Sequence, residues 1–168
     1  FSTGLLPANT LWWTNTPHGA MTALWEEPRV RRFALQEQAL KPPRRFIIPL
    51  PGLIFLCQPG QAPWVYAVRR KPTKLEDKVY RAPFCNVYDT GRTCPGTHKY
   101  PQQVSEIPDS FFRSFFSPGG VMTKRSIQFP NSVIALWESL VGKATYPLDD
   151  LVAHATVGDL IKLNVKGW

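Results

Sequence analysis

The stretch FIIPLPGLIFLCQPGQAPWVYAVR, residues 46–69, shows the secondary structure of this chain most clearly. It contains three apolar runs rich in β-branched and aromatic residues, at residues 46–48, 53–56 and 64–69. Short runs of this kind, bounded by proline and glycine, are typical of β-strands. Because Pro59 and Gly60 lie between the last two runs, we expect those two strands to pair in an antiparallel hairpin.

The sequence before this stretch continues the strand pattern. Alternating or continuous apolar runs predict further strands at residues 10–14, 21–26 and 30–36. Pro17, His18 and Gly19 supply a turn between the first two. The first two thirds of the chain therefore predict an antiparallel β-meander.

The last third of the chain changes to helical spacing. After Pro108, one helix face is predicted from Phe111, Phe112, Phe115 and Phe116. A second helix is expected to begin near Asn131 as N-cap, with a buried stripe of Val133, Ile134, Trp137, Leu140 and Val141. Thr156 and Asp159 have the spacing of a capping box. Strands followed by helices predict an α+β fold, with the helices packed on one side of the sheet.

Length and composition predict one folded domain over residues 1–168, because 43% of the residues are hydrophobic and 19% charged. Prolines interrupt the longest apolar stretch well before the ~20 residues of a membrane helix, so no membrane association is expected. Nothing near Phe1 has the pattern of a signal peptide, and three cysteines cannot all pair within the chain. We therefore expect a reducing, cytoplasmic location.

The formal net charge is +8, and basic residues gather at residues 29–32, 41–45 and 69–74. An excess of positive charge favours an acidic partner. Nucleic acid is the less favoured candidate, because the clusters lack the interleaved aromatic residues of the known binding modules. A solvated basic face or a docking face for an acidic protein is the preferred interpretation.

The segment YRAPFCNVYDTGRTCPGT, residues 80–97, is a long loop between the predicted sheet and the predicted helices. Long loops in compact domains are often functional. Within it, Cys94 stands among Gly91, Pro95 and Gly96, where apolar burial would be unusual. An exposed thiol is expected, and it is either an incidental surface cysteine or a catalytic thiolate.

The spacing in this loop resembles the active site of ubiquitin-conjugating enzymes. In that family, the Asn of a His-Pro-Asn tripeptide lies eight residues before the catalytic Cys, and a Gly lies three residues before the same Cys. In this chain Asn86, Gly91 and Cys94 stand at these positions. The runs at residues 79–101 and 107–112 more closely resemble family D of the prokaryotic ubiquitin-conjugating-enzyme-like proteins, the family of protein B of the plasmid-associated PRTRC system.

This resemblance implies a ubiquitin-conjugating fold and a transferase activity. Cys94 would receive a ubiquitin-like modifier protein as a thioester from an activating, ThiF-like enzyme and transfer it to an amine. Asn86 would donate a hydrogen bond to the oxyanion that forms during amine attack, or would only brace the loop. The activating enzyme would consume ATP, so no cofactor is expected here. The alternatives are an inactive scaffold of the same fold and a plasmid-associated nucleic-acid-binding protein.

The chain departs from the eukaryotic pattern at two positions before the Asn. Phe84 and Cys85 stand where that family has His and Pro, so the loop-ordering hydrogen bond of that His is lost. Pro95 follows Cys94 and removes a local N–H donor. Catalytic competence is therefore a separate question from the fold.

Three further residues are candidate accessories to the site. His98 would tune the thiolate or relay a proton, or would be a solvated loop histidine. Asp89 and Asp109 would orient the acceptor lysine or lower its pKa, although Asp109 equally suits a helix N-terminus. Cys57 is expected in the core, and Cys85 as a packed thiol, with a disulfide to Cys94 as a minor alternative. The spacing of Cys85, Cys94 and His98 does not suit a zinc site.

Overall fold

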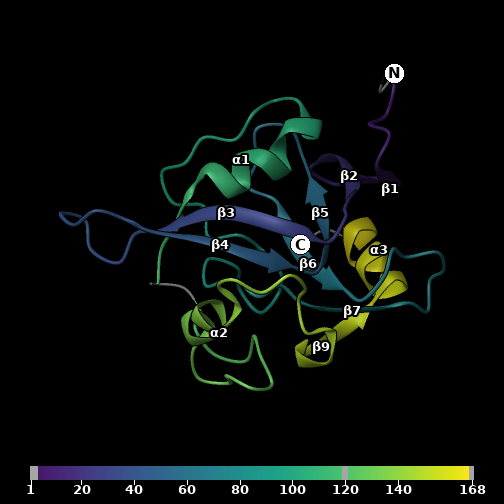
Figure 1. Ribbon diagram of the computed structural model, residues 1–168. Coiled ribbons are helices and arrows are strands. Elements are labelled where there is room, and N and C mark those ends of the chain that lie inside the picture. The colour runs from purple at the N-terminus through teal and green to yellow at the C-terminus, as the bar shows by residue number, and fades with distance from the viewer. Residues whose placement is uncertain (1–3, 119–120, 167–168) are drawn as a thin grey trace.

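The computed structural model describes residues 4–118 and 121–166, which form two β-sheets and three α-helices (Figure 1). The larger sheet has the strand order β1-β2-β5-β6-β7-β9, formed by Thr10–Thr16, Gly19–Glu26, Gly52–Cys57, Trp64–Val68, Lys78–Arg81 and Ala153–Thr156. The smaller sheet has the order β4-β3-β8, formed by Arg44–Leu50, Arg29–Leu35 and Phe115–Phe116. The helices are α1 at Ile107–Arg113, α2 at Val133–Leu140 and α3 at Val157–Lys166, with short 3-10 turns at Val104–Glu106 and Leu148–Asp150. The α+β prediction is confirmed.

All six strands predicted from the sequence are present, and the hairpins β1–β2 and β5–β6 pair as expected. The strands do not form one continuous meander, however. The β3–β4 hairpin leaves the larger sheet, so that β2 pairs directly with β5. Because the inner residues Phe33 and Phe46 of this hairpin are 4% exposed, folding it over the larger sheet buries its apolar face. The structure therefore has two β-layers around a common core.

The expectation that the helices pack on one side of the sheet is wrong for α3. Helices α1 and α2 lie beside β3 and β4 over one face of the larger sheet (Figure 1). On α3, Val157 and Leu160 instead pack with Met21, Ile54 and Tyr66, whose side chains point to the opposite face. Every residue of β5 is buried, so both faces of this central strand need a cover.

The Phe-rich helix is shorter than predicted. It ends at Arg113, and Ser114 has the extended dihedral angles φ −69° and ψ 155°. Phe115 and Phe116 form β8 instead, with Phe116 buried and Phe115 59% exposed. Pairing with β3 gives this segment backbone hydrogen bonds that override its helical spacing.

The other two helix starts are close to the predictions. Ser132, and not Asn131, is the N-cap of α2, since its hydroxyl accepts a hydrogen bond from the Ala135 N–H. Val141 lies beyond the end of α2 and is 58% exposed, so it is not part of the buried stripe. The capping box before α3 is confirmed, because Thr156 and Asp159 exchange hydrogen bonds of 3.0 and 3.2 Å.

Candidate functional site

The loop that carries Cys94 folds back on itself as a short antiparallel ladder. The Cys94 N–H donates to the Asn86 carbonyl at 2.7 Å, and the Tyr88 N–H donates to the Arg92 carbonyl at 2.8 Å. Val87 and Thr93 form a β-bridge between these two pairs. A spacing of eight residues therefore places Asn86 directly opposite Cys94 in this ladder.

Gly91 closes the turn of this ladder, where its N–H donates to the Tyr88 carbonyl at 2.9 Å. Its φ of +93° is unfavourable for any residue with a Cβ. A Cβ here would also lie 2.4 Å from the ring of Tyr66, whose hydroxyl donates to the Thr90 carbonyl at 2.6 Å. Only glycine fits this turn without displacing the loop from β6.

We predict that Gly91→Ala destabilises the protein by about 2 kcal/mol, from the positive φ and the contact with Tyr66 together. Denaturant unfolding measures the change. Gly96→Ala is the matched control, because φ there is +49° but nothing lies within 4 Å of the added Cβ. Equal losses of stability in the two variants would show that the contact with Tyr66 is unimportant.

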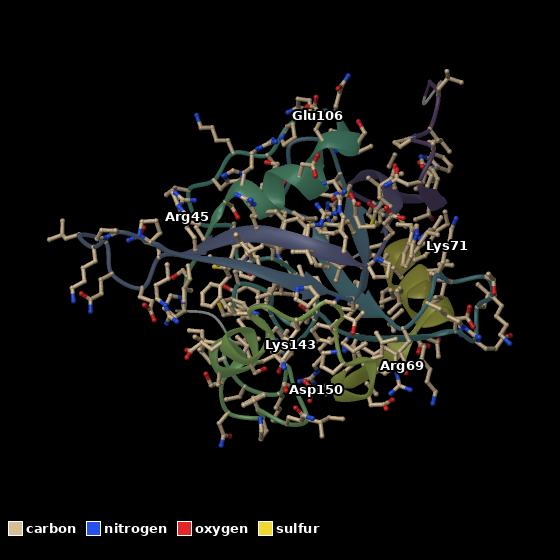
Figure 2. All side chains as sticks on the ribbon, viewed as in Figure 1. Arg45, Arg69, Lys71, Glu106, Lys143 and Asp150 are labelled. Carbon is tan, nitrogen blue, oxygen red and sulfur yellow. The ribbon has the colours of Figure 1, made fainter. Side chains whose placement is uncertain are left out.

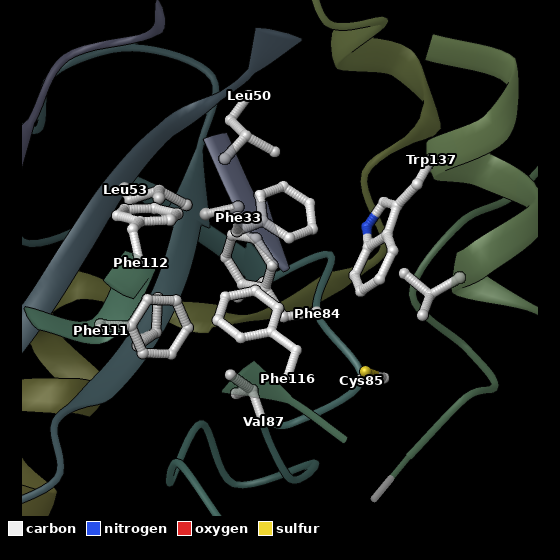
Figure 3. Packing of buried hydrophobic residues seen from close by; sticks show 14 of the residues in the cluster. Phe33, Leu50, Leu53, Phe84, Cys85, Val87, Phe111, Phe112, Phe116 and Trp137 are labelled. Carbon is white, nitrogen blue, oxygen red and sulfur yellow. The ribbon is translucent and has the colours of Figure 1, made fainter. Parts of the chain in front are cut away.

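The residues before Asn86 anchor the loop in the core. Phe84 is fully buried and packs edge-on against Phe33, Phe111 and Phe116 (Figure 3). The indole N–H of Trp137 on α2 donates to the Pro83 carbonyl at 2.8 Å. Phe84 therefore holds this segment by aromatic packing, at the position where the eukaryotic family has a histidine.

The three cysteines differ in accessibility. Cys57 and Cys85 are fully buried, whereas Cys94 is partly exposed. Burial raises the pKa of Cys85 to about 12, and its thiol donates to the Ser117 carbonyl at 3.3 Å. Burial likewise raises the pKa of Cys57 well above its ordinary value. All three are free thiols, so the Cys85–Cys94 disulfide is not formed, and Cys94 is the accessible thiol.

A cavity of about 870 Å³ opens beside Cys94. It is bounded by residues 94–100 and by Gln36, Glu37 and Ala39 from the β3–β4 connection. Arg113 at the end of α1 and the following residues Ser114, Phe115 and Ser117 complete the lining. Asn86, Cys94 and His98 all line it. The structure thus brings three of the five predicted site residues to one cavity of a size that accommodates a peptide segment.

The Asn86 side chain is 7% exposed, and its Oδ1 has no hydrogen-bond partner among the described residues. The contact of Asn86 with Cys94 uses the backbone carbonyl, so it does not depend on the amide group. A buried amide oxygen without a partner carries a desolvation cost, and such groups are concentrated at functional sites.

His98 is tied to α1, with its Nε2 2.8 Å from the Ser110 Oγ and its ring edge-on to Tyr100. Burial lowers the pKa of His98, and the charge of Arg113 lowers it further. The imidazole is therefore neutral at pH 7 and has the capacity to accept a proton.

Tyr88 was not singled out from the sequence. In the ladder it lies diagonally across from Cys94, and a hydrogen bond with the Cys94 thiol raises the pKa of Tyr88. The signal available in the sequence was its position two residues after Asn86, which places both side chains on the same face of an extended strand.

Asp89 and Asp109 lie outside the residues that bound the cavity. Asp89 accepts hydrogen bonds from Arg125 at 2.9 Å and Arg81 at 3.2 Å. Partial burial favours its neutral form, but these two guanidinium groups hold the pKa of Asp89 below its ordinary value. Arg125 is 1% exposed and also donates to the Val87 carbonyl, so the ion pair supports the ladder from behind.

Asp109 is held on the far side of α1, where its Oδ1 lies 3.4 Å from the Arg31 guanidinium. Arg31 is itself 9% exposed and bonded to Glu26 at 3.0 Å. No side-chain cap bond is made to the start of α1 within the described residues, so Asp109 serves neither as N-cap nor as a lining residue of the cavity.

The basic residues are spread over the molecule. Arg45 on β4 lies far from Arg69 and Lys71, which lie at the other end of the view (Figure 2). Arg44 forms ion pairs with Glu37 and Glu138 at 3.5 and 3.4 Å. Part of the positive charge is therefore neutralised locally.

The described residues contain neither a membrane-spanning helix nor a cluster of metal-ligating side chains. No helix is long and apolar enough to cross a membrane within residues 4–118 and 121–166. In the same ranges, no three side chains of His, Cys, Asp or Glu gather closely enough to hold a metal ion.

Comparison with known proteins places the chain by its sequence. No curated protein and no solved structure matches it significantly. The family model described as prokaryotic E2 family D matches residues 1–154, which include the whole Asn86–Cys94 ladder and the cavity beside it. The chain therefore belongs to prokaryotic E2 family D.

Proposed function

We propose that this protein has a ubiquitin-conjugating fold, accepts a ubiquitin-like modifier as a thioester on Cys94 and transfers it to an amine. The observation that carries the proposal is the geometry of the ladder. Cys94, the accessible one of the three thiols, lies opposite the buried Asn86, and both residues line the same cavity. Membership in the prokaryotic E2 family supports it. The partners would be the modifier and a ThiF-like activating enzyme.

Loading exchanges one thioester for another. The Cys94 thiolate attacks the carbonyl carbon of the thioester on the activating enzyme, and a new C–S bond forms. The sulfur of the activating enzyme leaves with the electron pair and takes up a proton. The energy comes from ATP consumed by that enzyme, so this chain needs no cofactor of its own.

Discharge converts the thioester into an amide. The amine nitrogen attacks the carbonyl carbon, the C–S bond to Cys94 breaks, and the nitrogen gives up a proton. We assign the oxyanion donor to the Asn86 Nδ2. The neutral imidazole of His98 in the same cavity is the candidate proton acceptor.

Reconstitution tests the proposal. The protein is incubated with ATP, a ThiF-like activating enzyme and a ubiquitin-like modifier protein, and is then separated without reductant. The expected product is an adduct that thiol reductant releases. The alternative, an inactive scaffold, predicts binding of the modifier without any reducible adduct, so this assay decides between the two.

We predict that neutralising Arg69, Arg70 and Lys71 to glutamine slows loading about fivefold at low ionic strength. Arg70 is 77% exposed and only weakly paired with Asp77 at 3.7 Å, so its charge is available to steer an acidic partner. Since ~0.1 M salt screens charges beyond about 10 Å, the difference should disappear at high salt. Stopped-flow loading kinetics measure it.

The control for this prediction removes the same number of charges from β3, β4 and their connection, as Arg32→Gln, Lys41→Gln and Arg45→Gln. An equal effect of both triple variants would indicate net charge and not a local docking face. Steeply salt-dependent binding of DNA by the wild-type protein would favour the nucleic-acid alternative instead.

A further inference from the structure

The short strand β8 is an edge of the smaller sheet. Within residues 4–118 and 121–166 it pairs only with β3, in parallel, with Ala34 opposite Phe115 and Leu35 opposite Phe116. Sheet edges carry unpaired backbone groups, which proteins usually cover or use for binding. The backbone groups of β8 that point away from β3 are therefore the ones that could bind another chain.

The register shows which backbone groups point to that side. The Gln36 N–H on the β3 side donates to the Phe116 carbonyl at 2.8 Å. Neighbouring residues of a strand direct their N–H and C=O groups to opposite sides. The N–H and C=O of Phe115 therefore point away from β3.

Phe115 is also part of the cavity beside Cys94. It lines this cavity together with Arg113, Ser114 and the 94–100 segment. Phe115 is 59% exposed, which is a large apolar surface for an edge strand. The same residue thus combines backbone groups that point away from β3 with an exposed aromatic ring at the cavity of Cys94.

We propose that the C-terminal tail of the modifier binds as an added strand on β8, with its backbone paired to the N–H and C=O of Phe115 and its last carbonyl carbon at Cys94. This inference rests on the proposed function. The tail is the occupant because its carboxyl end must reach the Cys94 sulfur, and an extended chain in that cavity runs beside the β8 edge. Pairing through backbone groups requires an N–H on the tail at alternate positions, so the site excludes a tail with proline there.

Phe115→Pro tests the pairing directly, because proline lacks the N–H but can occupy an edge strand. The observed angles of Ser114, φ −69° and ψ 155°, suit a residue that precedes proline. Phe115→Ala is the matched control, since it removes the ring and keeps the N–H. The probe is an N-acetylated Ala/Gly hexapeptide benzyl thioester, and the measurement is its rate of acylation of Cys94 by mass spectrometry.

We expect Phe115→Pro to acylate about fivefold more slowly than Phe115→Ala, with unchanged thermal stability of both. N-methylation of single amides along the probe should slow the reaction of the wild type at alternate positions only, with a period of two. Equal rates for the two variants and no alternation along the probe would overturn strand addition while leaving Cys94 as the acceptor. Failure of the probe to acylate Cys94 at all, with acylation of free cysteine as the positive control, would overturn the proposed function itself.

Discussion

Cys94→Ala is expected to abolish the covalent adduct with the modifier completely, because no other accessible thiol is present to take its place. Cys57 and Cys85 are fully buried, and burial raises the pKa of Cys85 to about 12. Their thiolate populations at pH 7 are negligible, and neither sulfur is exposed to a partner protein. Gel separation without reductant, after incubation with activating enzyme, modifier and ATP, measures the adduct.

Cys94→Ser is the informative companion of this variant. Its hydroxyl should form an oxygen ester that survives thiol reductant but not hydroxide, which identifies the atom that carries the modifier. Cys57→Ala and Cys85→Ala, by contrast, should retain the reducible adduct. A wild-type amount of adduct on Cys94→Ala would end the conjugation hypothesis.

Asn86→Ala is expected to discharge the thioester to free lysine about a hundredfold more slowly than the wild type, as for the loss of one preorganised oxyanion donor. Loading should change less, since the activating enzyme contributes groups to that step. The fold should survive, because the ladder bond to Cys94 uses the Asn86 backbone carbonyl, which the substitution leaves in place. Single-turnover discharge at saturating lysine measures the rate.

The bracing role of Asn86 makes a different prediction for the same variants. If the side chain only holds the loop, Asn86→Ala should lower the melting temperature and slow loading and discharge together. Asn86→Asp keeps the size and removes the donor, so under the oxyanion role it should resemble Asn86→Ala in discharge. Normal discharge by both variants at full thioester occupancy would remove Asn86 from the mechanism.

Strands were easier to predict from this sequence than their partners. The runs at residues 46–48, 53–56 and 64–69 are continuous and bounded by proline or glycine, so local chemistry determines them. Strands β7 and β9 were missed. Tyr80 and Arg81 of β7 were assigned to the long loop, but this short strand pairs with β6 and β9. The four residues AHAT of β9 have little β-propensity and are held by pairing with β7. The Phe-rich segment was predicted to be helical as far as Phe116 because its phenylalanines have helical spacing. Pairing with β3 instead determines the extended conformation of Phe115 and Phe116.

The Asn86–Cys94 spacing, the turn glycine between them and the family of the chain follow from the sequence alone. These are local properties, because a short ladder forms from contiguous residues and its register follows from their number. Which residues share the cavity depends on tertiary packing. That packing brings Phe115 to the cavity of Cys94 and ties His98 to Ser110. It also ties Asp89 to Arg125 and Asp109 to Arg31, because these contacts join separate segments and depend on how the two sheets and α1 pack.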